Sequence, residues 1–124
     1  LLSYLTEAEL RYFYKVEALR RFTDHTITDP AEMDRELAQI RVQGYAVDNL
    51  ERFQKGRGIA VPVLDSDGRA IAAMLCLGRF DNSQDQQLVQ QMTALAKEMS
   101  DRLSASGDLP AAAADALPTL ESPA

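Results

Sequence analysis

The segment Glu36–Leu77, ELAQIRVQGYAVDNLERFQKGRGIAVPVLDSDGRAIAAMLCL, decides the fold of this chain. It begins as an amphipathic helix that stops at Gly44, continues through an acidic bend, and finishes in two apolar strands. The strands are predicted over Gly58–Asp65 and Ala70–Leu77, because each is a short apolar run bounded by turn residues. The Asp-Gly pair between them is typical of a tight turn, so the two strands should form an antiparallel hairpin.

The first of these strands contains a proline, Pro62, which has no backbone N–H to donate. We therefore expect this strand to lie at an edge of the sheet or to carry a bulge at Pro62. Its apolar run is continuous rather than alternating, which predicts burial on both faces.

Helices are predicted on both sides of the hairpin. Thr6 followed by Glu9 fits a capping box and opens a helix that runs through about Phe13 or beyond. A second helix is capped by Asp29 and ended by Gly44, as a left-handed cap would end it. Its buried face is predicted from the helical spacing of Met33, Leu37 and Ile40.

A long final helix is predicted from about Ser83 to Leu103. Its apolar stripe is expected to consist of Leu88, Met92, Leu95, Met99 and Leu103, widened by Val89 and Ala96. Residues 1–103 would then form one α+β domain, and the Ala- and Pro-rich residues 104–124 a disordered tail. Leu1–Leu5 reads as the tail of a helix whose beginning is absent, and Phe22–Asp29 as a short extended piece.

Composition limits the classes of function. The 124 residues are 46% hydrophobic and 26% charged, which is ordinary for one soluble globular domain. A net charge of -6 argues against binding of a nucleic-acid backbone by this chain. The apolar runs are too short to span a bilayer and there is no basic signal sequence, so a cytoplasmic location without membrane contact is expected.

Catalytic and metal-binding patterns are scarce. The single cysteine, Cys76, is expected to be a small buried hydrophobe rather than a nucleophile, and it agrees with a reducing compartment. The sole histidine, His25, is expected to be structural or at the surface. Neither a metal set nor a glycine-rich phosphate loop is recognisable, so no metal and no cofactor are predicted and the chain is not expected to be an enzyme.

Three short motifs carry a family resemblance. Arg41 with Gly44-Tyr45-Ala46 is similar to an Arg-x-x-Gly-Tyr motif, and Thr26-Ile27-Thr28-Asp29 to a Thr-Ile-Thr segment. Leu1–Leu5 looks like the end of a helix that begins with a Gly-Lys pair. Together they resemble the effector-binding domain of IclR-type bacterial transcriptional regulators, which implies a GAF-like antiparallel sheet with flanking helices. The resemblance also implies that the domain's first part, and a winged helix-turn-helix that binds DNA, precede the point where this chain starts.

The resemblance implies a ligand pocket as well. An acidic residue, a cysteine and two serines of the family's pocket fall here on Asp48, Gly58, Leu75 and Leu77. Only the acid is retained. Hydrogen bonds to a charged ligand contribute roughly 1.5–3 kcal/mol each, so three lost anchors correspond to several decades of affinity. We therefore expect an apolar or aromatic effector, or a pocket that has lost its ligand, unless both leucines are simply core residues.

The function predicted from the sequence is effector sensing and oligomerisation within a transcriptional regulator, as a homodimer or homotetramer. DNA would be bound only through a winged helix-turn-helix outside this chain. One alternative is a ligand-free module that serves only for dimerisation or interaction. Another is a small hydrolase or transferase, for which the sequence offers only Cys76 and His25, far apart and without a third group.

Overall fold

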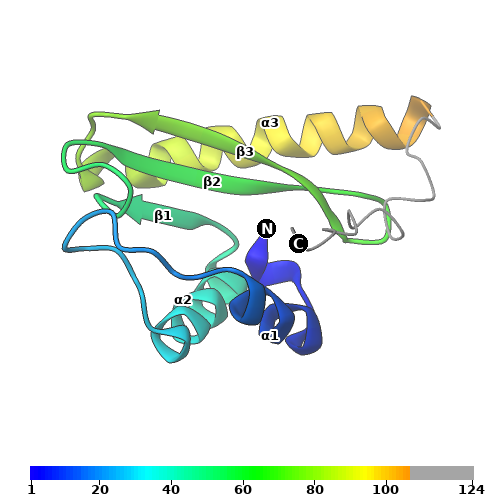
Figure 1. The fold of residues 1–124 in the computed structure, drawn as a ribbon. Coiled ribbons are helices and arrows are strands. Elements are labelled where there is room, and N and C mark those ends of the chain that lie inside the picture. Colours follow the sequence, from blue (N-terminus) through cyan, green and yellow to red (C-terminus); the bar gives the residue numbers. More distant parts are fainter. Residues whose placement is uncertain (107–124) are drawn as a thin grey trace, which may run out of the picture.

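A three-stranded antiparallel sheet with helices on both sides forms the fold in the computed structural model, which describes residues 1–106 (Figure 1). The elements in chain order are η1 (Leu2–Tyr4), α1 (Glu7–Val16), α2 (Pro30–Gln43), β1 (Ala46–Asn49), β2 (Arg57–Leu64), β3 (Ala70–Gly78), η2 (Asn82–Gln84) and α3 (Asp85–Ser106). The strand order is β1-β2-β3, so β2 is central. This architecture confirms the predicted α+β class and the β2-β3 hairpin.

The predicted N-caps of the first two helices and the predicted end of the second are confirmed. The Thr6 side chain accepts a hydrogen bond from the Glu9 N–H, and the Glu9 carboxylate accepts from the Thr6 N–H at 2.7 Å. Asp29 caps α2 by accepting from the Glu32 N–H at 2.9 Å. Gly44 ends α2 with φ +84°, a left-handed conformation that glycine adopts without steric cost.

One strand was not predicted. The segment expected to be an acidic bend contains β1, whose Val47 and Asp48 lie opposite Ile59 and Gly58 of β2. Asp and Asn are poor strand formers, so the four residues of β1 carry little local strand signal. Pairing with β2, which follows after residues 50–56, places them in the sheet.

The core lies between α3 and one face of the sheet, and the two elements run side by side in Figure 1. Three residues of β2 are almost completely buried there: Ile59, Val61 and Val63. From α3, Met92 and Ala96 are buried, whereas Leu95 is 53% exposed and Met99 45% exposed. The predicted stripe is therefore wrong at Leu95 and Met99. The small residue Ala96 lets α3 approach the sheet closely. The buried side of α3 is therefore centred on Met92 and Ala96.

The second face of β2 is only half-buried except at Gly58, so the prediction of burial on both faces holds fully for one face alone. The predicted edge position is also wrong for β2 as a whole. Pro62 nevertheless lies beyond β1, which pairs only with residues 57–60 of β2, and the sheet has an irregularity one residue further on, between Val63 and Leu64. Among the described residues a proline at this position breaks no β1 pairing.

The flanking segments differ from their predictions in detail. Within Leu1–Leu5 a single 3-10 turn forms, and Phe22–Asp29 is an irregular loop. The last helix starts at Asp85, after η2, and continues to Ser106, past the predicted end at Leu103. The predicted tail from residue 107 onward lies outside the described residues. No helix in residues 1–106 has the length and hydrophobicity that a membrane crossing requires.

Candidate functional site

A hollow of about 260 Å³ lies between the half-buried face of the sheet and the helical side formed by η1 and α2. All three strands contribute to its wall, through residues such as Asp48, Gly58 and Leu75. Helix α2 contributes the apolar face that the sequence predicted, Met33, Leu37 and Ile40. The hollow therefore forms where the apolar side of α2 faces the sheet surface that α3 does not cover.

The structure brings the four sequence-predicted site residues onto one face of the sheet. Asp48, Gly58 and Leu77 are direct partners across β1, β2 and β3, and Leu75 lies two residues before Leu77 on β3. Direct partners point to the same side of a sheet, and so do residues two apart. Asp48, Gly58 and Leu75 line the hollow.

Gly58 is the point where the four residues touch. A Cβ placed on Gly58 would lie 2.8 Å from Leu77 Cδ2, 3.4 Å from Asp48 Cβ and 3.5 Å from Leu75 Cδ1. The first distance is too short for a carbon contact, so Leu77 occupies space that any side chain at position 58 would need. Because Gly58 has no side chain, it leaves room for the bulky leucines on β3.

The alternative that both leucines are core residues is wrong in the described part of the chain. Leu75 is 56% exposed and Leu77 57% exposed, because β3 turns its other side, with Met74 and Cys76, toward α3. Leu77 does not line the main hollow. It lines a separate depression of about 360 Å³ that also includes Phe53.

Asp48 has a structural contact beside its position in the hollow. Its Oδ1 accepts the backbone N–H of Glu51 at 2.8 Å and so closes the turn after β1. Within this turn Leu50 has φ +66°, a left-handed conformation that is costly for a residue with a side chain. An aspartate acceptor at position 48 thus helps to hold a strained turn at the edge of the hollow.

Two threonines fasten the loop that precedes α2 onto the same turn. The Thr23 hydroxyl donates to the Leu50 carbonyl at 2.7 Å, and the Thr26 hydroxyl donates to the Glu51 carbonyl at 2.6 Å. Thr26 also accepts from the Thr23 N–H at 2.9 Å. These bonds fix the position of Ile27, the next residue, which lines the hollow.

Two carboxylates of the wall were missed from the sequence, Glu36 and Glu51. Glu36 lies three residues after Met33 and four before Ile40, so the helical spacing already placed it on the apolar side of α2. Glu51 had no such signal, because the turn that carries it is set by contacts distant in the sequence. Burial raises the pKa of Glu51, and the charges of Asp48 and Glu36 raise that pKa further.

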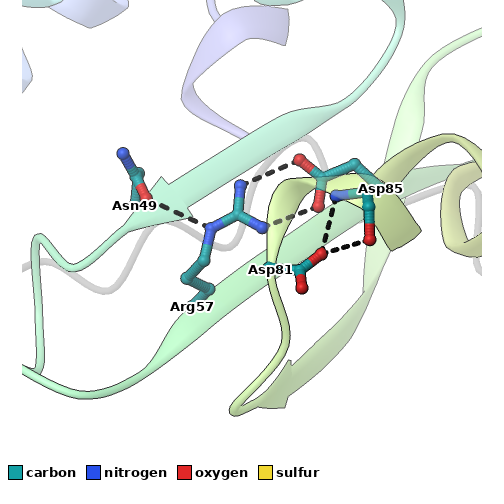
Figure 2. A network of polar contacts seen from close by, with 5 residues as sticks. Asn49, Arg57, Asp81 and Asp85 are labelled. Atoms are coloured by element: carbon teal, nitrogen blue, oxygen red, sulfur yellow. Dashed lines mark hydrogen bonds and ion pairs between the residues drawn. The ribbon is translucent and has the colours of Figure 1, made fainter.

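A polar network holds the far end of this sheet region to α3 (Figure 2). The guanidinium of Arg57 donates to both carboxylate oxygens of Asp85 at 2.7 and 2.8 Å, and its Nε donates to Asn49 Oδ1 at 3.1 Å. The Arg57 guanidinium also lies 5.4 Å from the centre of the Phe80 ring. Arg57 directly precedes Gly58, so the network also helps to position Gly58 in the wall of the hollow.

The candidate nucleophile and base do not form a site. Cys76 is half-buried against the core beside α3, on the opposite side of the sheet from the hollow. His25 is exposed, as the sequence predicted, and its backbone N–H donates to the Thr23 hydroxyl at 3.1 Å. Within residues 1–106 there is no group of three His, Cys, Asp or Glu side chains that could hold a metal ion.

Comparison with known proteins identifies the family. The family model for the bacterial transcriptional regulator IclR C-terminal domain matches residues 1–101. The HTH-type transcriptional regulator BhcR of Paracoccus denitrificans is 38% identical over 103 residues, which cover 81% of this chain and 37% of BhcR. The p-hydroxybenzoate hydroxylase transcriptional activator of Acinetobacter baylyi is 33% identical over 78% of this chain and 35% of its own length. The chain thus spans about a third of these relatives.

Solved structures show the same fold. The C-terminal domain of the E. coli regulator KdgR matches with a TM-score of 0.77 at 30% identity, over 83% of this chain and 65% of that one. A PobR inducer-binding domain from Acinetobacter, solved as a double mutant with 3-hydroxybenzoic acid, matches with a TM-score of 0.68 at 30% identity, over 83% and 59%. These relatives are transcriptional regulators, which confirms the predicted class and the expectation that the chain is not an enzyme.

Proposed function

Because this chain belongs to the family of IclR-type bacterial transcriptional regulators, which its residues 1–101 match, we propose that it is the effector-sensing part of such a regulator. A small molecule would bind in the hollow between α2 and the sheet and alter operator affinity through the rest of the protein. Coupling between an effector site and a DNA site is typically about 1–3 kcal/mol. The observation that carries the proposal is the hollow itself, with Asp48, Gly58 and Leu75 in its wall.

The surroundings of these residues favour an apolar or aromatic effector over a small hydrophilic acid. β3 carries leucines at the two positions where the family's pocket has serine hydroxyls. Ten of the fifteen residues that line the hollow are apolar. One relative supports an aromatic ligand class by analogy, the PobR domain solved with 3-hydroxybenzoic acid. Asp48 is proposed as the polar anchor.

A filled-hollow variant tests the proposal in the full-length protein. Ala60 lies on β2 beside Ala46 and Leu75, so Ala60→Leu should occupy the hollow. Ligands that raise the melting temperature of the unmodified protein, which mass action requires of a true effector, should lose this effect in Ala60→Leu. Ala94→Leu, an equal change on the exposed side of α3, is the matched control. Equal ligand responses in both variants would rule the hollow out as the effector site.

A ligand-free assembly module is the second candidate. It is favoured by the exposed apolar row on β3 formed by Ile71, Leu75 and Leu77. A homodimer or homotetramer stays a prediction for either candidate, and light scattering of the full-length protein measures it. If no small molecule shifts the melting temperature, and Leu75→Ser with Leu77→Ser dissociates the oligomer, the assembly role is preferred.

A further inference from the structure

The helical side of the hollow is separate from the core of the fold. Figure 1 shows α1 and α2 on one side of the sheet and α3 on the other. Within residues 1–106, none of the buried core residues, and none of the partly buried side chains packed against them, comes from η1, α1 or α2. The apolar side of α2, with Met33 and Leu37, lines the hollow instead. The core packing that holds α3 to the sheet therefore does not extend to α2.

The helical elements on this side are joined to one another. The Tyr14 hydroxyl donates to Asp34 Oδ1 at 2.9 Å, which connects α1 to α2. Arg41 Nε donates to the Ser3 carbonyl at 2.6 Å, which connects η1 to α2. A movement of α2 would therefore carry η1 and α1 with it.

Helix α2 is tied to the sheet at its two ends, and the two ties differ in kind. Its C-terminal end continues through Gly44 into the segment of β1, and Gly44 has φ +84° with open space where a Cβ would stand. Its N-terminal end is held through the preceding loop, where the Thr23 and Thr26 hydroxyls donate to the Leu50 and Glu51 carbonyls. The first tie is covalent, whereas the second consists of hydrogen bonds that water can replace.

The turn that receives these hydrogen bonds is strained. Leu50 has φ +66°, a conformation that costs free energy for a residue with a side chain. Three side chains hold the turn in place, because Asp48 accepts the Glu51 N–H while Thr23 and Thr26 bind the two carbonyls. Release of the threonine hydroxyls would let the turn relax, so the strain favours separation of the loop from the sheet.

We propose that α2 is a lid over the hollow, that it turns about Gly44, and that Thr23 and Thr26 are positioning residues that hold it closed. Release of the two hydroxyls opens the space between α2 and the sheet, and their return encloses a molecule bound there. Hinges of this kind are a few residues at the ends of elements. The inference rests on the proposed function for what enters the hollow, an effector, whereas the opening itself is measurable without one.

The test measures opening in the full-length protein by the rate at which a buried thiol reacts with iodoacetamide. Leu37→Cys places a thiol in the middle of α2, at a position that lines the hollow and is only 4% exposed. Thr23→Val with Thr26→Val should raise its alkylation rate at least tenfold, because valine has the shape of threonine but leaves both carbonyls without donors. Thr23→Ser with Thr26→Ser keeps both hydroxyls and should retain the slow rate.

Cys76 is the internal control. It is half-buried against the core beside α3, so opening of the lid should leave its alkylation rate unchanged, whereas loss of the whole fold would raise the rate of both thiols. Thr93→Val, on the exposed side of α3, is the matched control and should change neither rate. Met33→Cys, which also lines the hollow, repeats the measurement if Leu37→Cys does not fold.

Two outcomes overturn the lid. One is an alkylation rate at position 37 that the valines leave unchanged, and the other is a rise at Cys76 as large as the rise at position 37. Neither outcome bears on the effector role, which the ligand response of Ala60→Leu tests separately.

Discussion

The ion pair between Arg57 and Asp85 should be a large single contribution to the stability of this fold. Their side chains are only 13% and 20% exposed, and two hydrogen bonds join them. Asp85→Ala would leave the Arg57 guanidinium largely dehydrated, with Asn49 Oδ1, the Phe80 ring and the nearby charge of Asp81 as its remaining partners. Asp85 also stands in the first turn of α3, where a negative charge is favoured by the helix dipole.

The expected magnitude follows from this burial. Removing one partner of a fully buried pair costs about 3–5 kcal/mol, and partial access of water to this pair lowers the figure. Loss of a charge at a helix N-terminus adds about 0.3–1 kcal/mol. For Asp85→Ala we therefore expect the free energy of unfolding to fall by about 2–4 kcal/mol.

The same helix supplies the control. Asp101 pairs with Lys97 at 2.7 Å, but both side chains are more than 60% exposed. Pairs of this type contribute about 0.3–0.5 kcal/mol, so Asp101→Ala should hardly change the free energy of unfolding. Urea unfolding of the full-length protein, followed by circular dichroism, measures both variants. If the losses for Asp85→Ala and Asp101→Ala differ by less than about 1 kcal/mol, burial does not set the strength of the Arg57 pair.

Three further predictions concern charge and titration. Glu51→Gln should stabilise the protein at neutral pH by less than about 1 kcal/mol, since a pKa raised in the folded state makes the ionised form unfavourable there while water still reaches this half-buried side chain. The gain should vanish below the ordinary glutamate pKa, where both side chains are neutral, and a gain that persists in acid would contradict this reasoning. Burial and the hydrogen bond to Asp34 raise the pKa of Tyr14 to about 12, so its contribution to stability is complete below pH 10 and is lost as the pH rises to about 12. The phenolate absorbance of the native protein should show this late step, and Tyr14→Phe should remove it; an unchanged titration would show that Tyr14 is not the group. The 124-residue chain alone should not retard double-stranded DNA at moderate salt, because its net charge is -6, and a mobility shift at micromolar protein would refute this.

Local chemistry made the helix ends predictable. The caps at Thr6, Asp29 and Gly44 depend on residues within a few positions of one another, and the structure forms each of them as expected. The β2-β3 hairpin was predictable for the same reason, since apolar runs and a turn signal lie next to each other. These elements needed no knowledge of the rest of the fold.

Features set by contacts between elements were not predictable. Strand β1 exists because it pairs with β2, and the stripe of α3 shifted away from Leu95 because small Ala96 approaches the sheet. Likewise, the exposure of Leu75 depends on which side of β3 meets α3. The resemblance pointed to Asp48, Gly58 and Leu75, which line the hollow, but the place of Glu51 depends on the hydrogen bonds that Asp48, Thr23 and Thr26 make to its turn.

The position of β3 has a consequence for handling the protein. Within the described residues β3 pairs on one side only, so the N–H and C=O groups along the outer edge of this nine-residue strand are unpaired and lie next to an apolar row. Exposed strands of this kind recruit further strands and promote aggregation. Arg69 and Arg79, which flank β3, carry charges of the kind that oppose such growth. We therefore expect replacement of these two arginines to lower the solubility of this chain in isolation more than it lowers the stability of the fold.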